Sequence, residues 1–249
     1  MSAAPPRAND PRQAAGRPLR LGALRGRAFA PLEPELERAL AGWLAGQEGP
    51  GSERMSAAAF RSGPWTVKRF PAPSVFGWLR TPRALRSARR HFACLPVPSP
   101  RPVVAVARSR RGPSLLVREF VPGRVLSELW GRDEASEAAL PAFLAELRRL
   151  PLQHGDLHPG NLLWTGTRWV LLDVDGLRHG LHLRARVLLG QWVCLASRLA
   201  DEARVERLFR RTQELAPGLD PTRWEDLRRA LARRGPSGVK GADAPVRMD

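Results

Sequence analysis

One short segment of the sequence brings two histidines, a carboxylate and an amide within eight residues. It runs from His154 to Asn161 as His-Gly-Asp-Leu-His-Pro-Gly-Asn, and an apolar run that ends in Asp173 follows it. Transfer of a phosphoryl group needs a carboxylate that accepts the proton of the attacking hydroxyl, oxygen ligands for Mg²⁺ and a cation on the phosphates. Asp156 fits the first role, and Asn161 and Asp173 fit the second.

The cation that this chemistry needs is Lys68. Among the 41 lysines and arginines, the only lysines are Lys68 and Lys240. Lys240 belongs to a Gly/Pro/Ser-rich tail, whereas Lys68 lies in the strand-like run 65–70. The compact ammonium of lysine binds a phosphate as a point charge, whereas the guanidinium of arginine binds it as a planar fork. We therefore expect Lys68 to bind the phosphates of a nucleotide.

A second interpretation of the 154–161 loop is a metal site. His154, Asp156 and His158 have the residue types that bind Zn²⁺, but the sequence offers no evident set of further ligands. In the interpretation that we prefer, His154 braces the loop by hydrogen bonding, and His158 orients it or lies near the acceptor substrate. The remaining imidazoles are those of His91, His179 and His182.

The 154–161 loop also has the spacing from aspartate to asparagine of a kinase catalytic loop. Together with Leu-Leu-Asp-Val-Asp-Gly at 171–176, it resembles the lipopolysaccharide kinase family, the Kdo and heptose kinases. Wider relatives are the RIO kinases and the aminoglycoside and choline phosphotransferases, which share a protein-kinase-like fold. The resemblance covers residues 50–200. The segment 86–92 is similar to the family's αC helix, and 115–123 is similar to its hinge.

The resemblance implies a role for each candidate residue. Asp156 would be the catalytic base, and ATP and Mg²⁺ would be the cofactors. The glycine-rich nucleotide loop is poorly matched, and Gly-Pro-Gly-Ser at 49–52 is only a candidate for it. The expected residues are His154, Asp156 and His158 for catalysis; Lys68, Glu119, Gly49 and Gly51 for the nucleotide; and Asn161 and Asp173 for the metal.

The sequence departs from the family pattern at the partner of the lysine. In active kinases the strand lysine pairs with a glutamate from αC, but His91 stands where that glutamate is expected. No Asp or Glu occurs between Glu53 and Glu119. We therefore predict that Lys68 has no ion pair with αC, that Asp173 is its nearest carboxylate, and that His91 faces the cleft.

Hydrophobic periodicity predicts the elements that position these residues. In the first half of the chain, it indicates helices over 34–45 and 82–94, and strands over 57–60, 65–70, 103–107 and 115–120. In the second half, Asp133 caps a helix, a hairpin spans 162–172, and helices cover 184–199 and 203–215. Asp220 as N-cap, with Pro221 at the first helical position, predicts a last helix.

These elements predict an α+β chain with a two-lobed protein-kinase-like fold. Residues 31–122 form a small β-rich lobe that binds the nucleotide and is preceded by a short helix. Residues 123–235 form a helical lobe that carries the catalytic loop and the metal site. The Arg/Pro-rich residues 1–30 and the tail 236–249 are expected to be disordered.

Composition restricts the partners and the location. The net charge of +17 points to anionic partners, and no apolar run is long enough for a membrane span. The N-terminus has no apolar signal core, and the two cysteines have no metal or disulfide spacing, which favours the cytoplasm. We expect ATP and an anionic glycolipid or sugar acceptor as partners, no specific nucleic acid, and a monomer. Peripheral contact with the cytoplasmic face of the inner membrane is left open.

The preferred function is an ATP-dependent kinase that phosphorylates a sugar hydroxyl of the lipopolysaccharide core or lipid A. Alternatives are a RIO-like protein kinase, another small-molecule kinase, and a weakly active or non-catalytic binding module with a kinase shape. The net charge of +17 disfavours a cationic aminoglycoside as acceptor, since like charges repel.

Overall fold

The chain divides into two compact units. The computed structural model describes residues 16–49, 51–56, 58–73, 81–93, 97–109, 111–150, 152–174, 177–179 and 185–234. Unit 1 comprises Met1–Pro122 and Val170–Leu177, and unit 2 comprises Gly123–Trp169 and Arg178–Asp249. The short segment Val170–Leu177, which contains Asp173, therefore belongs to the unit of the first half. The sequence analysis had placed it in the helical lobe.

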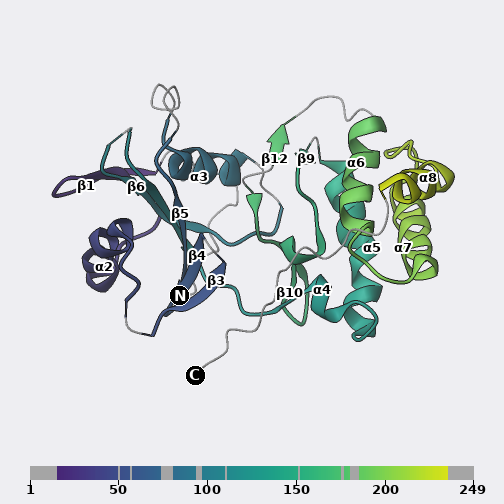
Figure 1. The fold of residues 1–249 in the computed structure, drawn as a ribbon, viewed down its shortest axis with the longest axis horizontal. Coiled ribbons are helices and arrows are strands. Elements are labelled where there is room, and N and C mark those ends of the chain that lie inside the picture. The colour runs from purple at the N-terminus through teal and green to yellow at the C-terminus, as the bar shows by residue number, and fades with distance from the viewer. Residues whose placement is uncertain are drawn as a thin grey trace, which may run out of the picture. The chain divides into compact units, whose positions relative to one another are not determined.

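Unit 1 is built on an antiparallel sheet of seven strands (Figure 1). Strands β6 and β7 are central and carry an almost unbroken apolar run, because both faces of the sheet are covered at that point. The order across the sheet is β1 (Arg17–Leu21), β2 (Leu24–Ala28), β6 (Pro102–Ala107), β7 (Ser114–Glu119), β5 (Trp65–Phe70), β4 (Ala59–Ser62) and β3 (Glu53–Ser56).

Helix α2 (Pro34–Ala45) packs on one face of this sheet. Its buried side chains, Leu36, Leu40, Trp43 and Leu44, share a core with Val67 of β5. Successive strand residues point to opposite faces, so Lys68 must point to the other face of the sheet.

Helix α3 (Arg83–Ala93) covers that second face. Ala84 and Ala88 are fully buried and pack with Ala105 of β6 and Leu116 of β7. The small side chains of the two helical alanines allow the helix to lie close to the strands. The sequence predicted a helix over almost the same residues, 82–94.

The expected disorder of residues 1–30 is wrong for residues 16–30, where β1 and β2 form a hairpin that pairs with β6. Leu24 and Ala28 are buried in this hairpin. A Cβ atom on Gly26 would lie 2.0 Å from the carbonyl oxygen of Ala105, so a glycine is needed for this close approach. Residues 1–15 and 235–249, which contain the remaining expected disorder, lie outside the described residues.

Unit 2 is mainly helical. Asp133 caps α5 by accepting a hydrogen bond of 2.9 Å from the backbone N–H of Ser136, as the sequence predicted. The helices are α4 (Leu126–Leu129), α5 (Glu134–Arg149), the 3₁₀ turn η2 (Pro159–Asn161), α6 (Ala185–Ala196), α7 (Glu202–Leu215) and α8 (Trp224–Arg234). The short strands are β8 (Arg124–Val125), β9 (Leu152–His154), β10 (Leu162–Trp164), β11 (Trp169–Leu171), whose last residues enter unit 1, and β12 (Leu177–His179).

Asp220 is not the N-cap that the sequence predicted, because α8 begins only at Trp224. Its carboxylate is buried instead, 3.2 Å from Nε of Arg148 and 2.8 Å from the indole N–H of Trp192. A buried guanidinium needs a counter-charge, and Asp220 supplies it for Arg148 while its Oδ1 accepts a hydrogen bond of 3.0 Å from the backbone N–H of Thr222. Among the described residues, no helix is long and apolar enough to cross a bilayer.

Candidate active site

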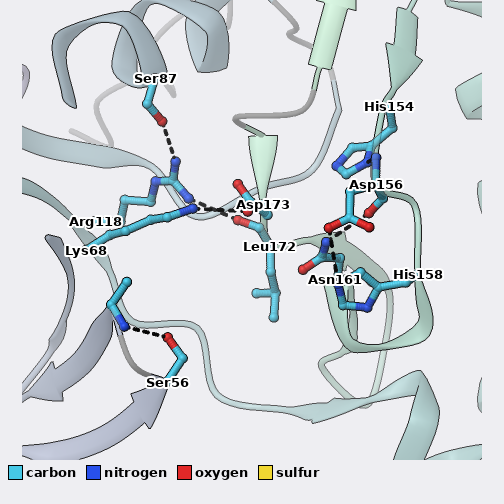
Figure 2. Close-up of polar contacts among 11 residues, drawn as sticks. Ser56, Lys68, Ser87, Arg118, His154, Asp156, His158, Asn161, Leu172 and Asp173 are labelled. Atoms are coloured by element: carbon cyan, nitrogen blue, oxygen red, sulfur yellow. Dashed lines mark hydrogen bonds and ion pairs between the residues drawn. The ribbon is translucent and has the colours of Figure 1, made fainter. Parts of the chain in front are cut away.

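The 154–161 loop joins β9 to β10 in unit 2 (Figure 2). His154, the last residue of β9, is 5% exposed, and its Nδ1 accepts a hydrogen bond of 3.1 Å from the backbone N–H of Asp156. An Nδ1 that accepts in this way leaves the proton of the neutral ring on Nε2. The geometry of His154 is therefore that of a residue that braces the loop, and it does not point its Nδ1 lone pair at a reactant.

The carboxylate of Asp156 is open to solvent, with 62% of its side chain exposed. Two long contacts flank it: Nε2 of His158 lies 3.7 Å from Oδ2, and the thiol of Cys194 lies 3.6 Å from Oδ1. An exposed carboxylate on a braced loop can accept a proton from a hydroxyl that approaches from solvent. Cys194, on α6, is a neighbour that the sequence gave no reason to consider.

His158 shapes the end of the loop. Its Nδ1 accepts a hydrogen bond of 3.1 Å from the backbone N–H of Gly160, which caps the short 3₁₀ turn η2. A Cβ atom on Gly160 would lie 3.0 Å from the ring of His158, so a larger residue would push the ring away. The remaining ring N–H, on Nε2, is on the side of Asp156.

Asn161 is fixed by the same loop. Its side-chain N–H₂ donates a hydrogen bond of 2.9 Å to the backbone carbonyl of Asp156, as Figure 2 shows. With the donor half of the amide used in this way, the amide oxygen is the atom that could serve as a metal ligand. This hydrogen bond joins Asp156 and Asn161, which are five residues apart in the chain.

Lys68 and Asp173 lie together in unit 1. Nζ of Lys68 is 3.0 Å from Oδ2 of Asp173, and both side chains are partly exposed. Lys68 reaches this position because the alternation of β5 points it to the α3 face of the sheet. Asp173 comes two residues after the end of β11. The predicted pairing of Lys68 with Asp173 is confirmed.

Arg118 is a site residue that the sequence analysis missed. It lies on β7, its side chain is 6% exposed, and it donates hydrogen bonds to the carbonyl oxygen of Leu172 (3.0 Å) and to Oγ of Ser87 on α3 (2.8 Å). Figure 2 shows Arg118 and Lys68 reaching the Leu172–Asp173 segment from neighbouring strands. The guanidinium therefore connects α3 to the residue before Asp173. An arginine at the end of the apolar run 115–117 was the signal available in the sequence.

His91 does not take the position that the sequence analysis gave it. It is 2% exposed, its Nδ1 is 3.0 Å from Oγ of Ser99, and it is not among the residues that line the cavity at Lys68. The reason is helical phase: Ala84, Ala88 and His91 lie at positions i, i+4 and i+7, and this stripe faces the sheet. Ser87 lines the cavity at Lys68 instead.

Burial lowers the pKa of His91 to about 4, and the nearby charges of Arg118 and Arg101 act in the same direction. The ring is therefore neutral at pH 7. It adds no positive charge next to the guanidinium of Arg118.

The structure does not bring Gly49 and Gly51 to Lys68. The sheet register places Ser56 opposite Ala59 and Ala59 opposite Lys68, whereas Gly51 lies beyond the other end of β3. The connection from β3 to β4 is thus the one that passes beside Lys68. Oγ of Ser56 accepts a hydrogen bond of 3.3 Å from the backbone N–H of Ala58 at this connection (Figure 2).

Glu119 is the last residue of β7 and lies opposite Trp65 of β5. Its backbone N–H donates to the carbonyl of Arg101 (3.0 Å), and the N–H of Phe120 donates to the carbonyl of Pro64 (2.8 Å). These two amides are therefore used within unit 1. Recognition of a nucleotide base at this position would rely on other backbone groups.

The zinc interpretation has no support in this geometry. Both Nδ1 atoms, of His154 and His158, accept hydrogen bonds from backbone N–H groups. In the part of the chain that the structure describes, no three His, Cys, Asp or Glu side chains gather as a metal site would require.

A scan against protein-family models and a search of curated protein sequences find no match. Solved structures do resemble the chain. The aminoglycoside-3'-phosphotransferase of type VIII is 19% identical with a TM-score of 0.51, and the similarity covers 81% of this chain and 98% of that one. WaaP, solved in complex with acyl carrier protein, is 17% identical with a TM-score of 0.50, over 82% and 96% of the two chains. The chain has a protein-kinase-like fold.

This protein-kinase-like fold confirms the predicted α+β class. Unit 1 holds a cation and a carboxylate, Lys68 and Asp173, and unit 2 holds the exposed Asp156 with the amide of Asn161. These are the side-chain types that phosphoryl transfer uses.

Proposed function

We propose that the protein is an ATP- and Mg²⁺-dependent phosphotransferase with Asp156 as its base. The observation that carries this proposal is the 154–161 loop of a protein-kinase-like fold. In this loop the buried His154 accepts a hydrogen bond from the backbone N–H of Asp156, whose carboxylate is exposed and whose carbonyl accepts from the amide of Asn161. A carboxylate in this position accepts the proton of the acceptor hydroxyl as the hydroxyl attacks the terminal phosphate. His158 orients the loop through its bond to the N–H of Gly160.

The donor set suits Mg²⁺, which prefers carboxylate and amide oxygens. The side chains that would hold the metal are Asp173 and Asn161, and the bound ion would neutralise charge on the nucleotide phosphates. Lys68 would then exchange its contact with Asp173 for the phosphates. Glu119 belongs to the segment that would approach the base, and Ser56 takes the place that the sequence analysis gave to Gly49 and Gly51.

The acceptor that we favour is a sugar hydroxyl of an anionic glycolipid, such as a Kdo or heptose residue of the lipopolysaccharide core. Support comes from the similarity of the 154–161 loop to that kinase family and from the net charge of +17. Such a charge attracts an anionic acceptor and repels a cationic one. A soluble enzyme that acts at the cytoplasmic face of the inner membrane fits this acceptor.

Phosphotransfer assays with labelled ATP test the proposal. The acceptors are Kdo–lipid A, heptosylated core, a peptide and an aminoglycoside, each with Mg²⁺ and with chelator. We expect transfer to one of the two glycolipids. Transfer to the peptide alone would favour a RIO-like protein kinase, and nucleotide binding without any transfer would favour a non-catalytic binding module.

The Asp156→Asn variant tests the base in the same assay. It removes the proton acceptor with little change in shape, so turnover should fall by about two to four orders of magnitude while Mg-ATP binding is kept. Glu225→Gln, on the first turn of α8, is the matched control and should retain turnover. Near-wild-type turnover of Asp156→Asn would remove this residue from the mechanism.

A further inference from the structure

Helix α6 contacts the exposed carboxylate of the 154–161 loop through one side chain, that of Cys194. Both residues belong to unit 2, and they are 38 positions apart in the sequence. Sγ of Cys194 lies 3.6 Å from Oδ1 of Asp156. Hydrogen bonds from a thiol to an oxygen are weak, but they recur in proteins. The residue proposed as the base therefore has a hydrogen-bond donor from a distant helix.

The packing of α6 fixes the position of Cys194. Leu188, Trp192 and Leu195 lie at positions i, i+4 and i+7 of the helix and are buried in unit 2. The indole N–H of Trp192 also donates a hydrogen bond of 2.8 Å to a buried carboxylate. Cys194 lies beside this stripe and is half-buried. Because a packed helix holds a side chain more precisely than a loop does, Cys194 is the fixed member of the contact with Asp156.

The thiol of Cys194 is protonated at neutral pH and is therefore the donor. Burial raises the pKa of this thiol, and the negative charge of Asp156 raises it further, while Arg198 and Arg234 only partly oppose these effects. A carboxylate can only accept, so the hydrogen of the thiol points to Oδ1. A thiol with a raised pKa is also a poor nucleophile, which makes covalent catalysis by Cys194 an unsuitable role.

The two oxygens of Asp156 have different surroundings. The torsion that turns a carboxylate is broad and roughly two-fold, so the two oxygens exchange unless a neighbour distinguishes them. Oδ1 is next to the thiol of Cys194, whereas Oδ2 lies 3.7 Å from Nε2 of His158. The second distance is longer than the roughly 3.2 Å of an ordinary N–H···O hydrogen bond.

We infer that Cys194 is a positioning residue, whose S–H group holds Oδ1 of Asp156 so that Oδ2 accepts the proton of the acceptor hydroxyl. The hydroxyl oxygen then bonds to the terminal phosphorus of ATP, and ADP leaves with the electrons of the broken P–O bond. This inference rests on the proposed phosphotransferase function. A thiol suits the role because it is a weak donor and does not stabilise the negative charge of the base as a cationic donor would.

Turnover in variants of α6 tests the positioning role. Labelled ATP is used with the acceptor that the wild type phosphorylates in the assays above. Cys194→Ala should lower kcat by about three- to tenfold, as the loss of one hydrogen bond predicts, and leave the KM for Mg-ATP unchanged. Cys194→Ser keeps a donor and should stay within about twofold of the wild type. Val193→Ala, which shortens the half-buried neighbouring side chain, is the matched control and should keep the wild-type kcat.

The reactivity of the thiol tests the contact without phosphoryl transfer. In the full chain with Cys94→Ser, Cys194 is the single cysteine, and its rate of alkylation by iodoacetamide at pH 8 reports the thiolate fraction. Adding Asp156→Asn removes a neighbouring negative charge with little change in shape, so this rate should rise at least about threefold. Glu225→Gln is the control and should leave the rate unchanged. Equal rates with Asp156→Asn and Glu225→Gln would show that thiol and carboxylate do not meet, and would overturn the inference.

The kinetic results separate this inference from the proposed function. A wild type that transfers phosphate, with an unchanged kcat in Cys194→Ala, would overturn the positioning role alone. Equal losses of kcat in Cys194→Ala and Cys194→Ser would also overturn it, because a donor would then have no effect. A wild type that transfers phosphate to none of the acceptors would overturn the proposed function, and the inference with it.

Discussion

At the scale of single residues, the carboxylate of Asp173 has two possible partners. In the structure its carboxylate pairs with Lys68 at 3.0 Å, and in the proposed function it holds Mg²⁺. The nucleotide and its metal must therefore compete with an existing ion pair. Because the pair is partly exposed, its own contribution to stability is small. Replacing the ion pair with a contact to the metal would therefore cost little free energy. This suits a residue that, in the proposed function, exchanges Lys68 for Mg²⁺ in each catalytic cycle.

The variant Asp173→Ala should lose the Mg²⁺ dependence of nucleotide binding. In the wild type, we expect Mg²⁺ to raise ATP affinity by at least about tenfold, because the metal screens repulsion between the carboxylate and the phosphates. The variant should bind ATP equally with Mg²⁺ and with chelator. Calorimetry under both conditions measures this difference, and Asp226→Ala, on α8, is the control. A Mg²⁺ effect that persists in Asp173→Ala would exclude Asp173 as a metal ligand.

The polar residues of the 154–161 loop could be predicted from sequence because they act within a few residues of one another. The side chains of His154 and Asn161 are both hydrogen-bonded to backbone groups of Asp156, so the spacing of these three residues in the sequence is enough to predict their arrangement. Arg118 and Ser56 could not be found in this way. Their partners are set by the register of a sheet whose strands are distant in sequence.

Arg118 links two elements, α3 and the segment after β11. In active kinases an ion pair between the strand lysine and a glutamate fixes αC. Here α3 has no acidic residue, and its Ser87 is held by a buried guanidinium that also holds the carbonyl of Leu172. One connection between α3 and the segment after β11 therefore passes through Arg118 of β7.

Arg118→Lys should weaken this connection while keeping the charge, since an ammonium lacks the planar fork that reaches two acceptors. We expect the KM for Mg-ATP to rise about tenfold, by analogy with residues that orient metal ligands. We expect unfolding stability to fall by about 1–3 kcal/mol, the cost of an unmade buried hydrogen bond. Steady-state kinetics and urea unfolding measure both. An unchanged KM in a folded Arg118→Lys variant would show that the link has no role in nucleotide binding.

His91 gives α3 a pH-dependent attachment to the sheet. Its pKa is lowered from 6.5 to about 4 in the folded chain by burial, Arg118 and Arg101, so the unfolded chain takes up the proton first. The contribution of neutral His91 to the free energy of unfolding is complete above pH 6.5 and is lost as the pH falls from 6.5 to about 4. The full difference corresponds to about 3 kcal/mol.

Urea unfolding at pH 7.5 and pH 4.5 tests this attachment. Between pH 7.5 and pH 4.5, the free energy of unfolding of the wild type should fall by about 2–3 kcal/mol more than that of His91→Gln, because glutamine has no titrating group. Equal losses in the two proteins would show that His91 titrates normally in the folded state.

The helices and strands around the site were predictable where one apolar stripe faces one core. The stripe of α2 and the alternation of β5 belong to this class. The β1–β2 hairpin was not predictable, because its strands are short and rich in arginine and only Leu24 and Ala28 are buried. Its stability depends on the edge of β6, which local sequence does not reveal.

At the scale of the whole molecule, unit 2 depends on a buried charge pair as well as on its apolar core. Arg148 of α5 and Asp220 before α8 are each less than 10% exposed, and Trp192 of α6 donates to the same carboxylate. Burial lowers the pKa of Arg148, and Asp220 opposes that effect. Three helical segments of one unit are thus joined at a single carboxylate.

Asp220→Asn should destabilise the protein by about 3–5 kcal/mol, because it leaves a buried guanidinium without its counter-charge. Asp226→Asn removes an exposed pair with Arg229 on α8 and should cost less than about 1 kcal/mol. Urea unfolding of both variants at pH 7 makes the comparison. A similar small loss in both would mean that Arg148 finds another anionic group or water when Asp220 is removed.

Because Val170–Leu177 belongs to unit 1, unit 1 cannot be completed on the ribosome until this segment has been translated. Lys68 and Arg118 are synthesised long before Leu172 and Asp173, to which they bond. Because domains tend to fold as units during synthesis, the N-terminal sheet must wait with these bonds unmade until the whole 154–161 loop has been translated. The nascent sheet would meanwhile expose an arginine-rich surface with no acidic residue between positions 54 and 118, close to the polyanionic RNA of the ribosome that is making it.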